Sequence, residues 1–139
     1  MKKIISLFLL LMFTCVTTQA STTTNIYNKT GQKIGSYKTN GKKIIQYNQN
    51  GSKTGSYRTN GNTTTSYDRH GSKTGSFKTS GNTTTQYDKS GSKIGSYKTN
   101  GNTTTSFDKY GHKTGSYKTD SSGKVTQYDK YGHKIQTFK

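Results

Sequence analysis

Aromatic side chains recur at every tenth position along most of this chain, with polar residues between them. The regular positions are Tyr27, Tyr37, Tyr47, Tyr57, Tyr67, Phe77, Tyr87, Tyr97, Phe107 and Tyr117, followed after one longer interval by Tyr128 and Phe138. A glycine follows four residues after each of the first nine. The ten-residue units alternate between two versions, so the full period is twenty residues. A period this short and regular is typical of a repeat architecture.

Each ten-residue unit predicts one short strand followed by one turn. Tyr and Thr favour strands, which we expect at 72–77 and 82–87 and at the equivalent positions of the other repeats. Asp and Gly bracket one kind of turn (68–71), and Thr-Asn-Gly forms the other (59–61). Asp at the first position and Gly at the left-handed position favour a type I turn with a glycine bulge. Asn-Gly also permits a two-residue turn.

Loop length decides which side chains share a face of the sheet. We expect three-residue loops in both kinds of turn, because Gly keeps the same offset from the aromatic residue in each. The expected cross-strand pairs are then Tyr67 with Lys53 and Lys73, and Phe77 with Thr63 and Thr83. In this register all the regularly spaced aromatic residues lie on one face, whereas a two-residue loop would reverse every side chain of the following strand.

The predicted fold class is all-β, with tandem ten-residue strand-turn units that form an antiparallel β-hairpin array with a twenty-residue repeat. The alternative is a β-solenoid with one twenty-residue coil per turn, in which like residues stack in parallel ladders. A single flat layer buries little apolar surface. We therefore expect the aromatic face to be covered by the sheet curling on itself, by another copy or by a ligand. One slip in the period, at 120–123, predicts an enlarged turn or a bulge.

Residues 1–20 differ in composition from the remainder. A Lys2-Lys3 head, an apolar run and a small-residue end at Ala20 predict a secretory signal peptide, and the run is too short to span a membrane. Cleavage after Ala20 would leave a β-repeat region at 21–139 with no membrane span. The alternative is a lipoprotein signal that uses Cys15, the only cysteine of the chain.

The β-repeat region is strongly basic. Without Lys2 and Lys3 it holds 20 basic and 5 acidic residues, a net charge of +15. A field of this size attracts polyanions. Basic and aromatic residues also alternate along the predicted sheet, which suits phosphate contact and base stacking on single-stranded nucleic acid, or an acidic polysaccharide. The candidate polyanion-binding residues are Lys53, Tyr67, Lys73, Tyr87, Lys93, Phe107 and Lys113.

The acidic residues and histidines indicate turns rather than catalysis. Four of the five acids follow an aromatic residue at the start of a turn, where Asp is an ordinary turn residue. The three histidines replace variable residues beside turn glycines and lack the spacing of metal ligands. We therefore predict a non-enzymatic protein without a cofactor or metal. The residues are Asp68, Asp88, Asp108, Asp120 and Asp129, with His70, His112 and His133.

Residues 47–134 resemble the YD repeats of bacterial Rhs-type surface and toxin proteins. The shared marks are Tyr-Asp-x-x-Gly, recurring at about twenty residues, and a second Gly midway. The resemblance implies hairpin arrays that curl into shells. Ser or His stands where the family has Arg after the turn glycine, and the chain has no cargo domain. The chain is also similar in kind to curli-type amyloid subunits, which are short, exported and built from tandem strand-turn units.

These patterns predict an exported protein, secreted, periplasmic or on the surface of a bacterial cell. Its predicted partner is an anionic surface polysaccharide or another polyanion, bound through many identical weak sites whose contributions add by avidity. The alternative is a self-assembling, amyloid-like structural subunit that associates through open sheet edges.

Overall fold

The computed structural model describes residues 21–138. The predicted signal peptide at 1–20 and Lys139 lie outside the described residues. The strands are β1 (Thr22–Asn28), β2 (Lys33–Asn40), β3 (Lys43–Asn48), β4 (Lys53–Asn60), β5 (Thr63–Asp68), β6 (Lys73–Ser80), β7 (Thr83–Asp88), β8 (Lys93–Asn100), β9 (Thr103–Asp108), β10 (Lys113–Thr119), β11 (Val125–Asp129) and β12 (Lys134–Phe138).

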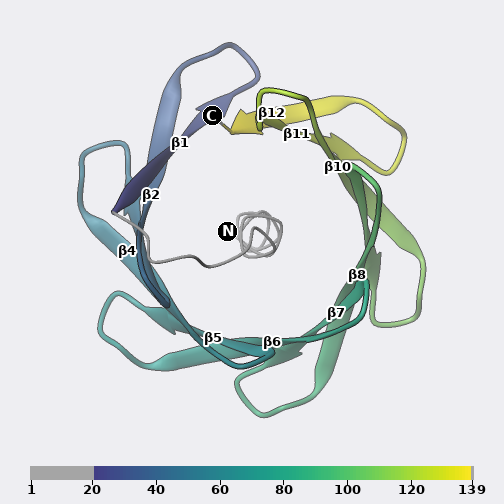
Figure 1. Cartoon of the computed structure of the whole chain (residues 1–139), viewed down its shortest axis with the longest axis horizontal. Helices are drawn as coiled ribbons and strands as arrows, with labels where there is room; N and C mark the ends of the chain where they lie inside the picture. Colours follow the sequence, from purple (N-terminus) through teal and green to yellow (C-terminus); the bar gives the residue numbers. More distant parts are fainter. Residues whose placement is uncertain (1–20, 139) are drawn as a thin grey trace.

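The strands form one closed antiparallel barrel in sequence order (Figure 1). β1 closes the ring by pairing with β12, where Ile26 lies opposite Phe138. The predicted all-β class and antiparallel hairpin repeat are confirmed. The solenoid alternative is wrong, because consecutive strands are hydrogen-bonded neighbours that run in opposite directions. Of the three expected coverings, the structure has the sheet curling on itself, which covers only the aromatic residues on its inner face.

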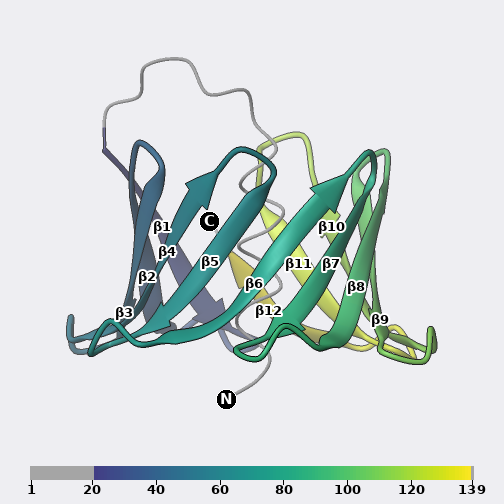
Figure 2. The same cartoon turned by 90° about the horizontal axis from the view of Figure 1, so that it is seen from below.

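The turns that start at Asp have the predicted three-residue loop. Asp68 N–H donates to Ser72 O at 2.9 Å, Gly71 N–H donates to Asp68 O at 3.2 Å, and Gly71 has φ 92°. Equivalent turns, which we call Asp-type turns, join β1–β2, β3–β4, β5–β6, β7–β8, β9–β10 and β11–β12, with Asn in place of Asp in the first two. Figures 1 and 2 show these loops flaring outward at one rim.

The turns at the opposite rim are shorter than predicted. Asn60 pairs with Thr63, so the loop holds only Gly61 and Asn62. Gly61, at the first central position, has φ 56°, as in a type II′ turn. The expected three-residue loop at 59–61 is therefore wrong, and so is the pairing of Phe77 with Thr63 and Thr83. Phe77 lies opposite Thr64 and Gln86 instead.

This one-residue difference places successive aromatic residues on opposite faces of the sheet, so the predicted single aromatic face is wrong. Tyr57 pairs with Ser66 on the inner face, and Ser56 pairs with Tyr67 on the outer face. The inner aromatic residues are buried, while the outer ones are half-buried. The inner set is Tyr37, Tyr57, Phe77, Tyr97, Tyr117 and Phe138, and the outer set is Tyr27, Tyr47, Tyr67, Tyr87, Phe107 and Tyr128.

The slip in the repeat is an enlarged turn, as predicted. Asp120 N–H donates to Lys124 O at 2.9 Å, and Gly123 N–H donates to Asp120 O at 3.0 Å. This hairpin thus has a three-residue loop at the rim that otherwise has two-residue turns. Thr119 pairs with the buried Val125, and Tyr117 pairs with the buried Gln127. Tyr117 therefore lies on the inner face and Tyr128 on the outer face, so successive aromatic residues still alternate between faces.

Candidate functional site

The outer wall of the barrel carries six aromatic–lysine pairs, which we call the outer belt. Each pair joins the last aromatic residue of one strand to the first lysine of the next, across an Asp-type turn. The lysines are exposed and the aromatic residues half-buried. The pairs are Tyr27 with Lys33, Tyr47 with Lys53, Tyr67 with Lys73, Tyr87 with Lys93, Phe107 with Lys113, and Tyr128 with Lys134.

Each belt pair lies next to a β-bulge, at which the register between the two strands shifts by one residue. The register shifts between Ser66 and Tyr67, so that Tyr67 pairs with Lys73 while Ser66 pairs with Gly75. The Thr74 hydroxyl, between Lys73 and Gly75, donates to Ser66 Oγ on the inner face at 2.9 Å. Bulges at barrel rims commonly redirect a side chain in this way.

All seven candidate polyanion-binding residues lie in the outer belt. The predicted pairing of Tyr67 with Lys73 is confirmed. The predicted pairing of Tyr67 with Lys53 is wrong, because Lys53 lies opposite Tyr47. Lys53 Nζ instead donates to Arg69 O, in the next Asp-type turn, at 3.4 Å. The belt is therefore a series of separate pairs and not one continuous row.

Outer aromatic residues also cover serines of the neighbouring strand. Tyr67 lies opposite Ser56 in β4, and Ser56 is only 7% exposed. Tyr87 lies opposite Ser76 in the same way. Each outer aromatic residue therefore has a lysine on one neighbouring strand and a serine or threonine on the other.

A second set of basic residues lies further along the outer wall, and we call it the basic row. Its members are exposed, and most lie opposite threonines rather than aromatic residues, as Arg58 lies opposite Thr65. The row consists of Lys38, Arg58, Lys78, Lys98 and Lys118.

Two neighbouring Asp-type turns share the sequence Asp-Lys-Tyr-Gly-His-Lys, at 108–113 and 129–134. Tyr110 and Tyr131 are each 74% exposed. Lys109 Nζ lies 4.8 Å from the centroid of the Tyr110 ring, and Lys130 and Tyr131 repeat this contact at the same distance. These turns add exposed aromatic and cationic groups beside the outer belt.

The acids have the predicted turn role. Asp68 Oδ1 accepts from His70 N–H and Ser72 N–H, both at 2.9 Å. The N–H of Ser72 contributes most to holding the pKa of Asp68 below its usual value. The hydroxyl of Ser122, followed by Lys124, lowers the pKa of Asp120 to about 2. The Asp carboxylates therefore accept hydrogen bonds from their own turns, which stabilises the turns.

These lowered pKa values predict acid sensitivity. Because the folded pKa of Asp120 lies below the unfolded value of 3.8, its contribution to stability is complete above that value and is lost as the pH falls towards about 2. We expect Asp120→Asn to be less stable than the parent chain near neutral pH, with a difference that shrinks as the pH falls from 3.8 through about 2. Urea unfolding across this range checks the expectation. A difference that grew on acidification would contradict it.

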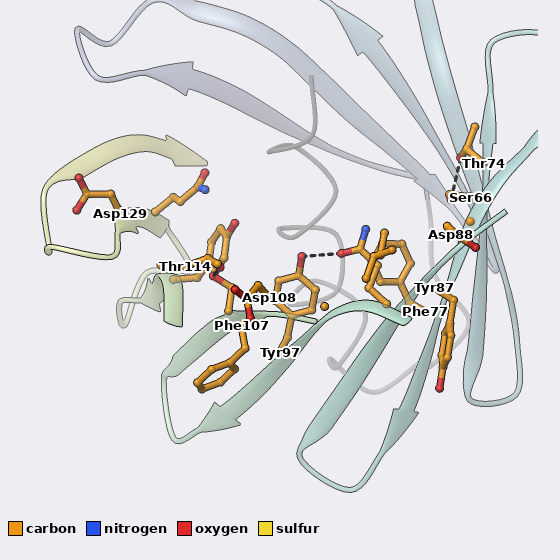
Figure 3. Close-up of a pocket in the computed structure, with 18 of the residues that line it drawn as sticks. Ser66, Thr74, Phe77, Tyr87, Asp88, Tyr97, Phe107, Asp108, Thr114 and Asp129 are labelled. Atoms are coloured by element: carbon orange, nitrogen blue, oxygen red, sulfur yellow. Dashed lines mark hydrogen bonds between the residues drawn. The ribbon is translucent and has the colours of Figure 1, made fainter. Parts of the chain in front are cut away.

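The barrel also encloses a cavity of about 730 Å³, which the sequence reasoning missed. Its walls come from β5 to β12, and it reaches the rim of the Asp-type turns, where Ile94 is 43% exposed. Figure 3 shows Phe77 and Tyr97 directed towards the cavity, and Tyr87 and Phe107 on the other side of the sheet.

Polar side chains between the inner rings bond to one another. The Tyr97 hydroxyl donates to Gln86 Oε1 at 3.0 Å (Figure 3). The Thr114 hydroxyl donates to Ser106 Oγ at 2.9 Å. Gln136 Nε2 donates to Gln127 Oε1 at 2.7 Å. Tyr57 on the inner face is 4% exposed, and this burial raises the pKa of its hydroxyl to about 12.

Two features of the sequence point to this inner surface. Glycines such as Gly75 and Gly95 fall inside strands, where Gly is unfavourable unless another backbone approaches closely. In addition, one position of the otherwise constant Thr-Thr-Thr-x-aromatic strand alternates between Ser and Gln, as at Ser66, Gln86 and Ser106. The structure places that position on the inner face.

No three His, Cys, Asp or Glu side chains within 21–138 are grouped so that they could hold a metal ion. The same part of the chain has no helix of the length and apolarity needed to cross a membrane. No protein-family model matches the chain, and the search of curated proteins finds no significant match. The resemblances to YD repeats and curli-type subunits therefore stay predictions.

Proposed function

We propose that this protein is an exported, non-enzymatic β-barrel that binds anionic polymers along its outer belt. The observation that carries the proposal is the sixfold recurrence of one aromatic–lysine pair at the same register around the outer wall. An exposed ammonium group attracts an anionic group, and a partly exposed ring offers a face on which a sugar or base can stack.

The spacing of the belt favours a polymer over a small anion. Successive pairs are two strands apart, which is about 10 Å across the sheet. A single small anion reaches one pair, whereas a flexible chain of charged units reaches several at once. The second contact is then intramolecular, so weak sites combine into a much stronger interaction. The basic row adds to the attractive field without adding aromatic partners.

Self-assembly through sheet edges has less support. Pairing of β1 with β12 closes the barrel, so each strand between residues 22 and 138 has a neighbour on both sides. A fibre would require the barrel to open along one pair of strands. Edge-driven assembly should therefore follow unfolding rather than occur from the native barrel.

A salt titration tests the proposal. We expect the purified protein to bind alginate, dextran sulfate or poly(dT) at about 50 mM salt, with an affinity that falls by roughly a thousandfold at about 200 mM if all six belt lysines are engaged. Fluorescence anisotropy of labelled polymer measures the slope of log affinity against log salt. Absence of binding to all three polymers at low salt would rule out the proposal.

A further inference from the structure

We propose that the cavity inside the barrel binds a neutral saccharide, at a site independent of the outer belt. Its volume of about 730 Å³ falls in the range of roughly 300–1,000 Å³ that is usual for small-molecule sites. The cavity is open at the rim of the Asp-type turns, where Thr74, Ile94 and Thr114 line it and are exposed. A ligand can therefore enter without strand separation.

The lining combines the two chemistries that a sugar ring requires. Phe77, Tyr97 and Tyr117 line the cavity and are 3%, 8% and 2% exposed, so the C–H face of a pyranose would contact these rings over a small area. The half-buried Gln86 supplies an amide group for its hydroxyls, while the Oε1 of the buried Gln127 accepts from Gln136 Nε2. A hydrocarbon ligand would remove the Gln86 amide nitrogen from water without giving it a partner, which costs free energy. The lining thus favours a hydroxyl-rich ring over a lipid.

Charge separates this site from the outer belt. The cavity lining that the structure describes includes Asp88, Asp108 and Asp129 and no basic residue. An anionic ligand would be repelled by these carboxylates, and no basic residue of the described lining offsets that repulsion. The lumen is therefore suited to an uncharged ligand, while the outer wall attracts anions.

The internal hydrogen bonds leave donors for a ligand. Gln86 Oε1 accepts a hydrogen bond from the Tyr97 hydroxyl, so the Gln86 amide nitrogen is the group that can donate to a sugar oxygen. Ser66 and Ser106 each accept from a threonine hydroxyl, which leaves their own hydroxyl hydrogens to donate. These groups are held in place before a ligand arrives, which reduces the entropic cost of binding.

Calorimetric titration with maltohexaose, cellohexaose and chitohexaose tests the proposal. We expect at least one of them to bind saturably, with a Kd below about 1 mM. Its affinity should change less than about twofold between roughly 50 and 500 mM salt, since no charge is involved. This salt independence separates the site from the outer belt, so that failure of either proposal leaves the other intact.

A matched pair of variants locates the site. Gln86 lines the cavity and accepts from Tyr97, while Gln46 occupies the equivalent place in β3 and accepts from the Tyr57 hydroxyl at 3.4 Å. We expect Gln86→Leu to weaken saccharide binding about tenfold, and Gln46→Leu to leave it within about twofold, with similar losses of stability. Equal effects of the two variants would overturn the assignment. So would failure of all three saccharides to bind, including the case in which only an apolar dye binds.

Discussion

Replacing five belt lysines with glutamine should weaken binding to alginate by about four thousandfold at low salt, since each lysine that lies against an anionic polymer contributes about 1 kcal/mol. In this variant glutamine replaces Lys53, Lys73, Lys93, Lys113 and Lys134. These lysines are exposed and lie opposite outer aromatic residues, so their loss removes charge while leaving the inner face unchanged. The slope of log affinity against log salt should fall by about four.

The basic row supplies a control of equal charge. Glutamine at Lys38, Arg58, Lys78, Lys98 and Lys118 also removes five positive charges from exposed positions of the same wall. Binding should weaken far less, by about tenfold, because this set weakens the general field but leaves the aromatic–lysine pairs complete. If the two variants lost the same affinity, net charge alone would explain binding and the belt would not be the site.

Substituting alanine for Gly75 should destabilise the barrel by about 1–3 kcal/mol, the usual cost of inserting a carbon where no space exists. A Cβ at this position would lie 2.5 Å from the backbone oxygen of Tyr87 in β7. The carbonyl belongs to a strand paired on both sides, so it cannot retreat without distorting the ladder. This cost exceeds the gain of about 0.4–1 kcal/mol from restricting the unfolded chain.

The neighbouring Ser76→Ala is the control for this experiment. Ser76 is half-buried on the outer face, and its replacement should change stability by less than about 0.5 kcal/mol. Urea unfolding of both variants measures the difference. A Gly75→Ala protein as stable as the parent chain would show that β6 and β7 can separate at this point, contrary to the structure.

Much of the secondary structure could be predicted because it depends on local chemistry. The Asp-type turn at 68–72 needs an acceptor at its first position and a left-handed residue at its fourth, and both are readable at fixed spacing. The pairing of Tyr67 with Lys73 follows directly from that loop. The candidate residues of the outer belt therefore lie together, although the reasoning that grouped them assumed a single aromatic face.

The opposite turns could not be predicted in the same way. Thr-Asn-Gly-Asn contains a glycine that can be the last residue of a three-residue loop or the first of a two-residue loop. Both conformations are locally acceptable, and they differ only in which face the next strand presents. The inner cavity was missed for this reason, because Gln86 and Ser66 lie on the face that was expected to be wet.

The amino-acid sequence by itself determines that this chain forms short strands joined by tight turns. It also determines that the net charge is strongly positive and that aromatic and basic residues recur with the same period. These properties reside within a few neighbouring residues. Tertiary structure alone decides that Phe77 and Tyr97 face inward while Tyr67 and Tyr87 face outward, and that β1 meets β12. Closure depends on the number, tilt and stagger of all the strands together, and no single repeat contains that information.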